Sequence, residues 1–317
     1  MKRSALILIG LATLLLVRSD ARAAPNGHTP VITVVLSQEI EPYRQTLDGL
    51  QRAFQGRQPI PRFRVVSMPE EAAAAERASF LSEIDPDSDL IVAIGARAAR
   101  ALRGRNLRAP LMVAAGADSG TREGAPGADH VVAGVSIEFP FAQQFQVLRS
   151  VAPRARTIGT IYARENRPLV VAAAAAAKNA GLTLSSVEIT SVKEIPAALD
   201  GLIGKVDALW ALPDATVFSR ETASYIILQT LRHRVPLMGF SQNSVKAGAL
   251  VALYCDFQDI GLQAGLMARD ILEGKRPASG ESVPPRKALL AINLRVADVI
   301  GLTIPADVRK RANSIYE

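Results

Sequence analysis

Short runs of β-branched or aliphatic residues, separated by longer helical stretches, constrain this chain more than any other feature of its sequence. Two clear examples are the runs at 31–36 and 90–94, which read VITVVL and LIVAI. Strands that are apolar at every position are covered on both faces, and strands that alternate with helices build parallel sheets from βαβ units. The sequence therefore predicts an α/β fold.

The runs fall into two series, and each series predicts one doubly wound, parallel-sheet lobe. The first has strands at 31–36, 63–67, 90–94 and 111–114, with helices at about 40–55, 70–83 and 96–103. The second has strands at 157–162, 183–189, 208–212, 237–240 and 249–253. A length of 317 residues suits two domains of about 150 residues each.

Two extended segments, 131–137 and 251–254, join the series and predict a multi-strand hinge. A helix at 257–273, a proline-marked linker at 284–285 and a strand at 288–293 follow. We assign residues 24–135 plus 254–280 to the N-terminal lobe and 136–253 plus 281–317 to the C-terminal lobe. Two lobes that close about a hinge can capture a small molecule without making bonds. The stretch 116–129 is either a loop at the ligand edge or a poorly ordered connection.

The N-terminus has the pattern of a secretory signal peptide over residues 1–23. Lys2 and Arg3 precede the uncharged stretch 5–17, and Ala21-Arg22-Ala23 forms a small-residue exit site. The uncharged stretch is shorter than the roughly 20 residues that a membrane anchor needs. No cysteine stands directly after this stretch, so we do not expect a lipoprotein. We expect cleavage after about Ala23 and a periplasmic or secreted product.

Composition excludes several classes of function. The formal net charge is +7, and it falls to +4 without residues 1–23, which carry a net +3. The arginines are scattered rather than gathered in a stripe, so we expect no nucleic-acid partner. One cysteine and three histidines offer no metal-ligand spacing, and we expect neither a metal nor another cofactor.

Catalytic motifs are missing as well. The chain contains no G-x-S-x-G, Walker A or G-x-G-x-x-G pattern. His233 lies between two arginines, a poor position for a general base, and Cys255 reads as a small buried residue. We therefore expect a binding protein rather than an enzyme.

Ligands of doubly wound sheets bind beyond the carboxyl ends of the strands, so the residues that follow each apolar run are the candidates for a site. These candidates are Ser37, Gln38, Gly95, Ala96, Arg97, Ser136, Tyr162, Arg164, Asp214 and Ser241.

Each candidate side chain has a binding interpretation and a structural alternative. The turn at Gly95 can present backbone N–H groups to a carboxylate or phosphate, or it can be only a tight turn. Asp214 can bind a ligand amine or cap a helix, and the two serines can bind a carboxylate or close turns. Tyr162 can stack on a ligand or fill the core, and Arg164 can bind an anion or remain solvated.

Several segments together resemble a known family: VITVVLSQEIEPYRQTLDGL, DLIVAIGARAARA, GVSIEFP, KVDALWALPDATV and AINLRVADVIGLTIP. They resemble ABC transporter substrate-binding proteins, the family that includes the tryptophan- and tyrosine-binding periplasmic proteins, from about residue 31 to 305. The resemblance implies a type I periplasmic-binding-protein fold, no catalysis, and cleft positions for Ser37, Ser136 and Asp214. Departures from the family pattern fall at Ala96, Arg97 and residues 163–166.

The resulting expectation is a monomeric solute-binding component of an ABC transporter. It would capture a small molecule, with an amino acid as one candidate, between its lobes. It would deliver that molecule to a permease and an ATPase in the inner membrane. The alternative is a periplasmic ligand-sensing subunit that signals to a membrane sensor kinase or cyclase.

Overall fold

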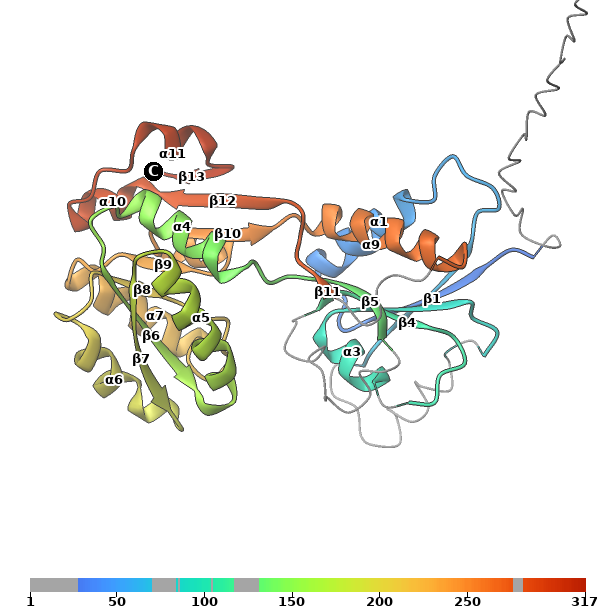
Figure 1. The fold of residues 1–317 in the computed structure, drawn as a ribbon, viewed down its shortest axis with the longest axis horizontal. Helices are drawn as coiled ribbons and strands as arrows, with labels where there is room; N and C mark the ends of the chain where they lie inside the picture. Colours follow the sequence, from blue (N-terminus) through green and yellow to red (C-terminus); the bar gives the residue numbers. More distant parts are fainter. Residues whose placement is uncertain (1–27, 70–83, 85, 104, 117–130, 276–281) are drawn as a thin grey trace, which may run out of the picture.

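The chain forms two α/β lobes joined by crossing segments, as Figure 1 shows. This computed structural model describes residues 28–69, 84, 86–103, 105–116, 131–275 and 282–317. The predicted signal peptide, the predicted helix at 70–83 and all of the predicted loop except Gly116 lie outside these residues. None of the helices in the described ranges is long and apolar enough to cross a membrane.

The described strands of the first lobe form a six-stranded sheet with the order β11-β5-β4-β3-β1-β2, in which all pairs are parallel. Its strands are β1 Val31–Leu36, β2 Arg62–Ser67, β3 Leu90–Ile94, β4 Leu111–Gly116, β5 Val131–Ser136 and β11 Ser282–Val283. Its helices are α1 Glu41–Arg52, α3 Ala96–Leu102 and α9 Phe257–Leu272. Every residue of β1, β3 and β4 is buried, in agreement with sequences that are apolar at every position except Thr33.

Helices α1 and α9 pack so closely that their backbones touch through glycines. A Cβ atom on Gly261 would lie 2.0 Å from the carbonyl oxygen of Thr46, and one on Gly49 would lie 2.1 Å from that of Gln258. Only glycine permits this approach. The contact fixes α9, which follows most of the second lobe in sequence, firmly to the first lobe.

The second lobe holds a seven-stranded sheet in the described residues, with the order β13-β12-β10-β9-β8-β6-β7. Its strands are β6 Thr157–Ala163, β7 Thr183–Ile189, β8 Ala208–Trp210, β9 Leu237–Gly239, β10 Val251–Cys255, β12 Ala288–Asn293 and β13 Ser314–Tyr316. Its α-helices are α4 Phe141–Val151, α5 Arg167–Asn179, α6 Ile195–Leu202, α7 Arg220–Arg232, α8 Gln242–Ala247, α10 Leu294–Ile300 and α11 Ala306–Arg311. The 3₁₀ turns Arg164–Asn166 and Val192–Glu194 precede α5 and α6.

The core of the second lobe is organised around Trp210, which is 1% exposed. Phe141 and Phe145 pack against its ring edge to face, with centroids 5.6 Å and 5.3 Å away. Such pairs stabilise beyond the area that they bury, by about 0.5–1.5 kcal/mol each. The packing fixes the start of α4 relative to β8.

The sheets depart from the sequence-based description at three points. The strand at 288–293 runs antiparallel to β10, and the C-terminal strand β13 was not expected. The two-residue strand β11 pairs with β5 of the first lobe, although the sequence-based division begins the last segment of the second lobe at residue 281. A strand of two residues carries no periodicity, so its partner could not be read from the sequence.

Three segments of the described chain cross between the lobes: residues 137–140, Asp256 and residues 284–287 (Figure 1). The Cys255 thiol donates to the carbonyl oxygen of Ile137 at 3.3 Å, which joins the first crossing to the second. Lys287 forms an ion pair with Asp256, which joins the second to the third. The crossings therefore hold one another in register at the hinge.

The third crossing is also bonded to α9. The Arg286 guanidinium donates to both carboxylate oxygens of Asp259, at 2.7 Å and 2.9 Å. Gln263 accepts from the backbone N–H of Arg286 and donates to the carbonyl oxygen of Pro284. Bidentate pairs of this kind add geometric specificity to the charge attraction. The pair therefore holds the third crossing in a fixed position relative to α9 of the first lobe.

Candidate functional site

A cavity of about 1130 Å³ lies where the two lobes meet the hinge. The first lobe contributes Glu41, Pro42, Gln45, Ser136 and Ser282, and all three crossings contribute residues. The second lobe contributes the start of α4, the ends of β8 and β9, and the turn into α8. A pocket between domains, lined mainly by apolar groups with a few polar ones, is typical of small-molecule sites.

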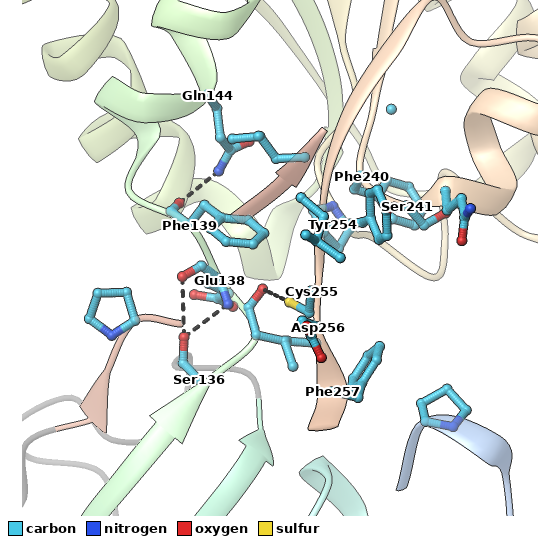
Figure 2. A pocket seen from close by; sticks show the side chains of 18 of the residues that line it. Ser136, Glu138, Phe139, Gln144, Phe240, Ser241, Tyr254, Cys255, Asp256 and Phe257 are labelled. Carbon is cyan, nitrogen blue, oxygen red and sulfur yellow. Dashed lines mark hydrogen bonds between the residues drawn. The ribbon is translucent and has the colours of Figure 1, made fainter. Parts of the chain in front are cut away.

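Aromatic side chains form much of the cavity wall: Phe139, Phe141, Phe240, Tyr254 and Phe257. Figure 2 shows four of them around the opening, with Phe139 on one side and Phe240 and Tyr254 on the other. Phe240 packs edge to face on Phe218 with centroids 5.6 Å apart, although it is 37% exposed. Ring faces of this kind suit a flat or apolar part of a ligand.

Gln144 links this wall to the core of the second lobe. Its side-chain NH₂ donates to the carbonyl oxygen of Phe139 at 2.8 Å (Figure 2). Its Oε1 accepts from Trp210 Nε1 at 2.8 Å. Both ends of the amide are therefore occupied within the protein. The contact positions the first crossing relative to the packed Trp210 ring.

Ser136 and Ser241 are the two predicted site residues that line the cavity. The Ser136 hydroxyl accepts from the backbone N–H of Glu138 at 2.9 Å, and it can donate to the carbonyl oxygen of that residue at 3.3 Å (Figure 2). Ser241 caps α8, where its hydroxyl accepts from the backbone N–H of Ser244 at 3.1 Å. Both hydroxyls shape turns at the cavity rim.

Two titratable groups of the hinge face the cavity with opposite tendencies. Burial disfavours the charge on Asp256, but hydrogen bonds from Lys287 and the Asp259 backbone outweigh it and lower the pKa of Asp256. Burial, with the neighbouring Asp256 charge, raises the pKa of the Cys255 thiol to about 12. Asp256 is therefore ionised and Cys255 is a neutral thiol at neutral pH.

The other predicted residues of the first lobe follow β1 and β3 and do not line the cavity: Ser37, Gln38, Gly95, Ala96 and Arg97. Ser37 is 1% exposed, and its hydroxyl accepts from the backbone N–H of Ala98 at 2.9 Å. Arg97 donates to the carbonyl oxygens of Ser37 at 3.3 Å and Pro69 at 2.9 Å. Gln38 follows β1 directly, and Ala96 is the first residue of α3.

Gly95 has a steric reason to be glycine. Its φ of +91° is strained for other residues, and a Cβ there would lie 2.6 Å from the Ser37 hydroxyl and from the Tyr43 ring. The tight-turn alternative therefore accounts for Gly95 without a ligand.

Tyr162 and Arg164 belong to a cluster centred on Glu188. The Tyr162 hydroxyl donates at 3.3 Å, Arg164 at 3.2 Å, and Arg167 donates twice at 2.7 Å. Hydrogen bonds from Arg167 are the main cause that holds the pKa of Glu188 at about 2. Tyr162 is 8% exposed and belongs to the apolar core. This position matches the alternative in which its ring fills the core.

Asp214 is 5% exposed and accepts four hydrogen bonds within its own lobe. One carboxylate oxygen accepts from the Ala163 backbone at 2.7 Å and the Asn166 amide at 2.8 Å. The other accepts from the backbone of Thr216 at 2.9 Å and Val217 at 3.1 Å. The two contacts with the backbone of Thr216 and Val217 match the capping alternative for Asp214. Asp214 also orients Asn166, which lines the cavity.

The sequence analysis did not identify five other residues of the cavity wall: Glu138, Phe139, Gln144, Phe240 and Tyr254. The prediction considered residues that follow strands, whereas Glu138 and Phe139 lie on the first crossing and Tyr254 stands two residues before the second. The signal was present in GVSIEFP and LYCDF, where aromatic residues stand next to the predicted hinge.

In the described part of the chain, no group of three or more His, Cys, Asp or Glu side chains could hold a metal ion. The residues that line the cavity offer a ligand aromatic ring faces, hydroxyls, amides and carboxylates.

A family model described as ABC transporter substrate binding protein matches residues 46–316. The chain belongs to this family. A tyrosine-binding protein of Clostridioides difficile is 25% identical over 198 residues, which cover 61% of this chain and 57% of that protein. An uncharacterized protein of Rickettsia prowazekii is 26% identical over 213 residues, covering 67% and 66% of the two chains. The chain thus spans less than two thirds of the length of these curated relatives.

Solved structures share the fold of this family member. An ABC domain from Streptococcus pneumonia in complex with L-Trp has a TM-score of 0.66 at 23% identity, covering 91% of this chain and all of that one. The ligand-free, open structure of a substrate binding protein with adhesive properties from Clostridium difficile has a TM-score of 0.72 at 19% identity, covering 91% and 99%. At these identities the likeness concerns the fold, which is the type I periplasmic-binding-protein fold.

Proposed function

We propose that this protein is the exported solute-binding component of an ABC transporter. It captures a small molecule in the cavity between its lobes by closing about the three crossings. The observation that carries this proposal is the lining of the cavity, which comes from both lobes and from every crossing. A ligand in this position contacts both lobes when they approach, so its binding energy favours the closed arrangement.

An amino acid is one candidate ligand. Support comes from the cavity's aromatic wall and from the two similar proteins that are described as binding tyrosine and L-Trp. In this proposal Ser136 and Ser241 contact the ligand directly. Ser37, Gly95 and Arg97 of the first lobe, together with Tyr162, Arg164 and Asp214 of the second, stay predictions for the closed form.

The proposed partners are a permease and an ATPase of the inner membrane, and the proposed location is the periplasm. The basic and apolar pattern of residues 1–23 supports export. A loaded, closed protein would be recognised by the permease and would release its ligand when the lobes open. We propose that the protein acts as a monomer.

The first test is a thermal-shift screen against amino acids, amines, sugars, nucleobases and organic acids, followed by calorimetry of each compound that shifts the transition. A ligand at 100 times its Kd adds about 2.7 kcal/mol to the free energy of unfolding. Small-angle scattering of the loaded protein should then report a smaller radius of gyration. A panel that produces neither a shift nor compaction contradicts the proposal.

A matched pair of variants places the ligand. Phe240→Ala removes an exposed ring from the cavity wall and should weaken binding about tenfold, as is usual for an aromatic contact. Val299→Ala removes an apolar side chain that is 54% exposed on α10, outside the cavity, and should leave the Kd unchanged. Equal effects of the two variants would mean that the ligand binds elsewhere.

The sensing role stays the alternative prediction. Uptake of the identified ligand by cells with and without the gene separates the two roles. Loss of uptake supports transport, whereas unchanged uptake with loss of a transcriptional or second-messenger response supports sensing.

A further inference from the structure

The side-chain amide of Asn166 belongs to the cavity wall and is held in one orientation. Its NH₂ group donates to Oδ2 of Asp214 at 2.8 Å. The backbone N–H groups of Ala163, Thr216 and Val217 donate to the same buried carboxylate. Because a carboxylate accepts hydrogen bonds, the Asn166 amide must turn its nitrogen towards Asp214 and its oxygen away from it.

The turn that carries Asn166 is fixed on both sides. On the side of β7, Glu188 accepts hydrogen bonds from Arg164 and Arg167, which stand before and after Asn166 in the turn. On the side of β8, Asp214 holds Asn166 itself. A side chain that is fixed before a ligand arrives loses little conformational entropy on binding. Asn166 is therefore preorganised.

The usual structural role of an asparagine in this position does not account for Asn166. It is the N-cap residue of α5, where an asparagine side chain commonly accepts a hydrogen bond from a backbone N–H of the first turn. Asn166 makes no such capping bond. Its bond to Asp214 uses the nitrogen, and Oδ1 has no hydrogen-bond partner among the residues that the structure describes. In Gln144, by contrast, both ends of the amide are occupied.

Apolar residues adjoin this amide in the cavity lining. Leu169 lies one turn further along the same face of α5, and Leu212 and Pro213 come directly before Asp214. Strands β8 and β9 separate β6 from β10, which leads into the second crossing, so Asn166 lies at the end of the cavity away from the hinge. A ligand group without a donor would leave this acceptor unpaired there, which costs affinity.

We infer that Asn166 determines part of the specificity of the cavity, because its Oδ1 accepts a hydrogen bond from an N–H or O–H group of the ligand. Asp214 is a positioning residue that fixes the orientation of this amide and acts on the ligand through it. A molecule that offers a hydrogen-bond donor at this end of the cavity is preferred over one of the same shape that lacks it. This inference rests on the proposed function and specifies the ligand further.

Pairs of ligands that differ by one donor test the inference. L-Tyrosine and L-phenylalanine differ by an O–H group, L-tryptophan and L-benzothienylalanine differ by an N–H group, and the α-deamino analogues lack the ammonium group. If these amino acids do not bind, the tightest compound of the broad screen is used, with each of its N–H and O–H groups replaced in turn. Calorimetry of the unaltered protein should identify one donor whose removal raises the Kd about fivefold or more.

The same ligand pairs are then measured with Asn166→Ala. Removal of the same donor should now change the Kd less than about twofold, because its acceptor is gone and the two losses are coupled. Asn179→Ala is the matched control, since it makes the same substitution at an exposed position of α5 outside this cavity. It should leave every Kd unchanged. Circular dichroism confirms that each variant is folded.

A second variant tests the role of Asp214. Asp214→Asn keeps the shape of the side chain but replaces one acceptor oxygen with an NH₂ group, so the orientation of the Asn166 amide is no longer fixed. It should weaken binding of the donor-bearing ligand in the otherwise unaltered protein and have no further effect on affinity in the Asn166→Ala background. Equal losses of affinity in both backgrounds would overturn the positioning role. The ligand pairs do not depend on this variant.

The outcomes separate this inference from the proposed function. If removal of each donor has the same effect in the unaltered protein and in Asn166→Ala, the inference is overturned and the proposed function stands. A ligand that contains neither an N–H nor an O–H group has the same consequence. A screen in which nothing binds overturns both the inference and the proposed function.

Discussion

The two lobes have similar sheets, but the residues that follow their strands differ in how much of the cavity wall they form. In the first lobe, Ser37, Gly95 and Arg97 bond or pack against one another and stay outside the cavity lining. In the second lobe, the start of α4 and the turns after β8 and β9 contribute a large part of the wall. The carboxyl end of a parallel sheet therefore gives a position for a site, while local hydrogen bonding decides which side chains remain available to a ligand.

Asp214 gives the largest expected effect in the second lobe. Asp214→Ala leaves the buried backbone donors of Ala163 and Val217, and the half-buried donor of Thr216, without an acceptor. Each such group costs about 1–3 kcal/mol, so we expect a loss of about 3 kcal/mol or more in the free energy of unfolding. Urea denaturation measures it.

The exposed Asp200 on α6 provides the control, because Asp200→Ala should change stability by less than about 0.5 kcal/mol. If Asp214→Ala is as stable as the unaltered protein and loses only ligand affinity, then Asp214 binds the ligand. Its role would then not be to hold the second lobe together.

The contact between α1 and α9 provides the matching test in the first lobe. In Gly261→Ala the new Cβ would meet the Thr46 carbonyl at 2.0 Å, so the helices must separate. Overpacking of this kind costs about 1–3 kcal/mol, and we expect the upper end because the obstacle is backbone. Thermal unfolding followed by circular dichroism measures the loss.

Gly201 is the matched control for this substitution. It lies in α6 with open space around its Cβ position, so Gly201→Ala should be neutral or stabilise by up to about 1 kcal/mol. A harmless Gly261→Ala would show that α9 is not fixed to the first lobe as closely as the packing indicates.

Gln144 tests whether the wall of the second lobe depends on its core. Gln144→Leu removes the acceptor of Trp210 Nε1 and the donor to Phe139, which should cost about 1–2 kcal/mol. Because Phe139 lines the cavity, ligand affinity should fall as well. Gln146→Leu on the same helix, outside this cavity, serves as the comparison. An unchanged affinity in Gln144→Leu would separate the wall from the core.

The smallest effect concerns pH. The pKa of Glu188 lies at about 2 in the folded chain, below its usual 4.5, so its ion pair stabilises the fold above pH 4.5. This contribution falls as the pH drops from about 4.5 towards 2. The Tm difference between the unaltered protein and Glu188→Gln should therefore be constant near pH 7 and smaller at pH 3. Parallel Tm curves would mean that the pair with Arg167 does not hold in solution.

The fold was largely predictable from the sequence, because runs of β-branched and aliphatic residues such as 31–36 and 90–94 identify buried strands directly. Family membership followed from local motifs. The short strand β11, the added strand β13 and the antiparallel pairing of β12 were not predictable, because pairing is decided by tertiary position.

The candidate site was less predictable than the fold. Ser136 and Ser241 were identified by their place after strands, and both line the cavity. The sequence could not show that Ser37 and Asp214 form their hydrogen bonds within their own lobes. Their partners lie 48 to 61 residues away in sequence or, for Asp214, also in the next turn. It also could not show that Phe139, Phe240 and Tyr254, which come from separate segments, line one cavity.

The interleaving of the lobes has a consequence for how the chain is made. The sheet of the first lobe includes β11 at Ser282–Val283 and is covered by α9, while the sheet of the second lobe includes β12 and β13 near the C-terminus. Domains often fold one after another as they are synthesised, the N-terminal one first. Here the sheet of the first lobe cannot be completed before residue 283 has been made, and the face of α1 that receives α9 stays uncovered until residues 257–272 have emerged. The first lobe is therefore completed only after strands β6 to β10 of the second lobe have been synthesised.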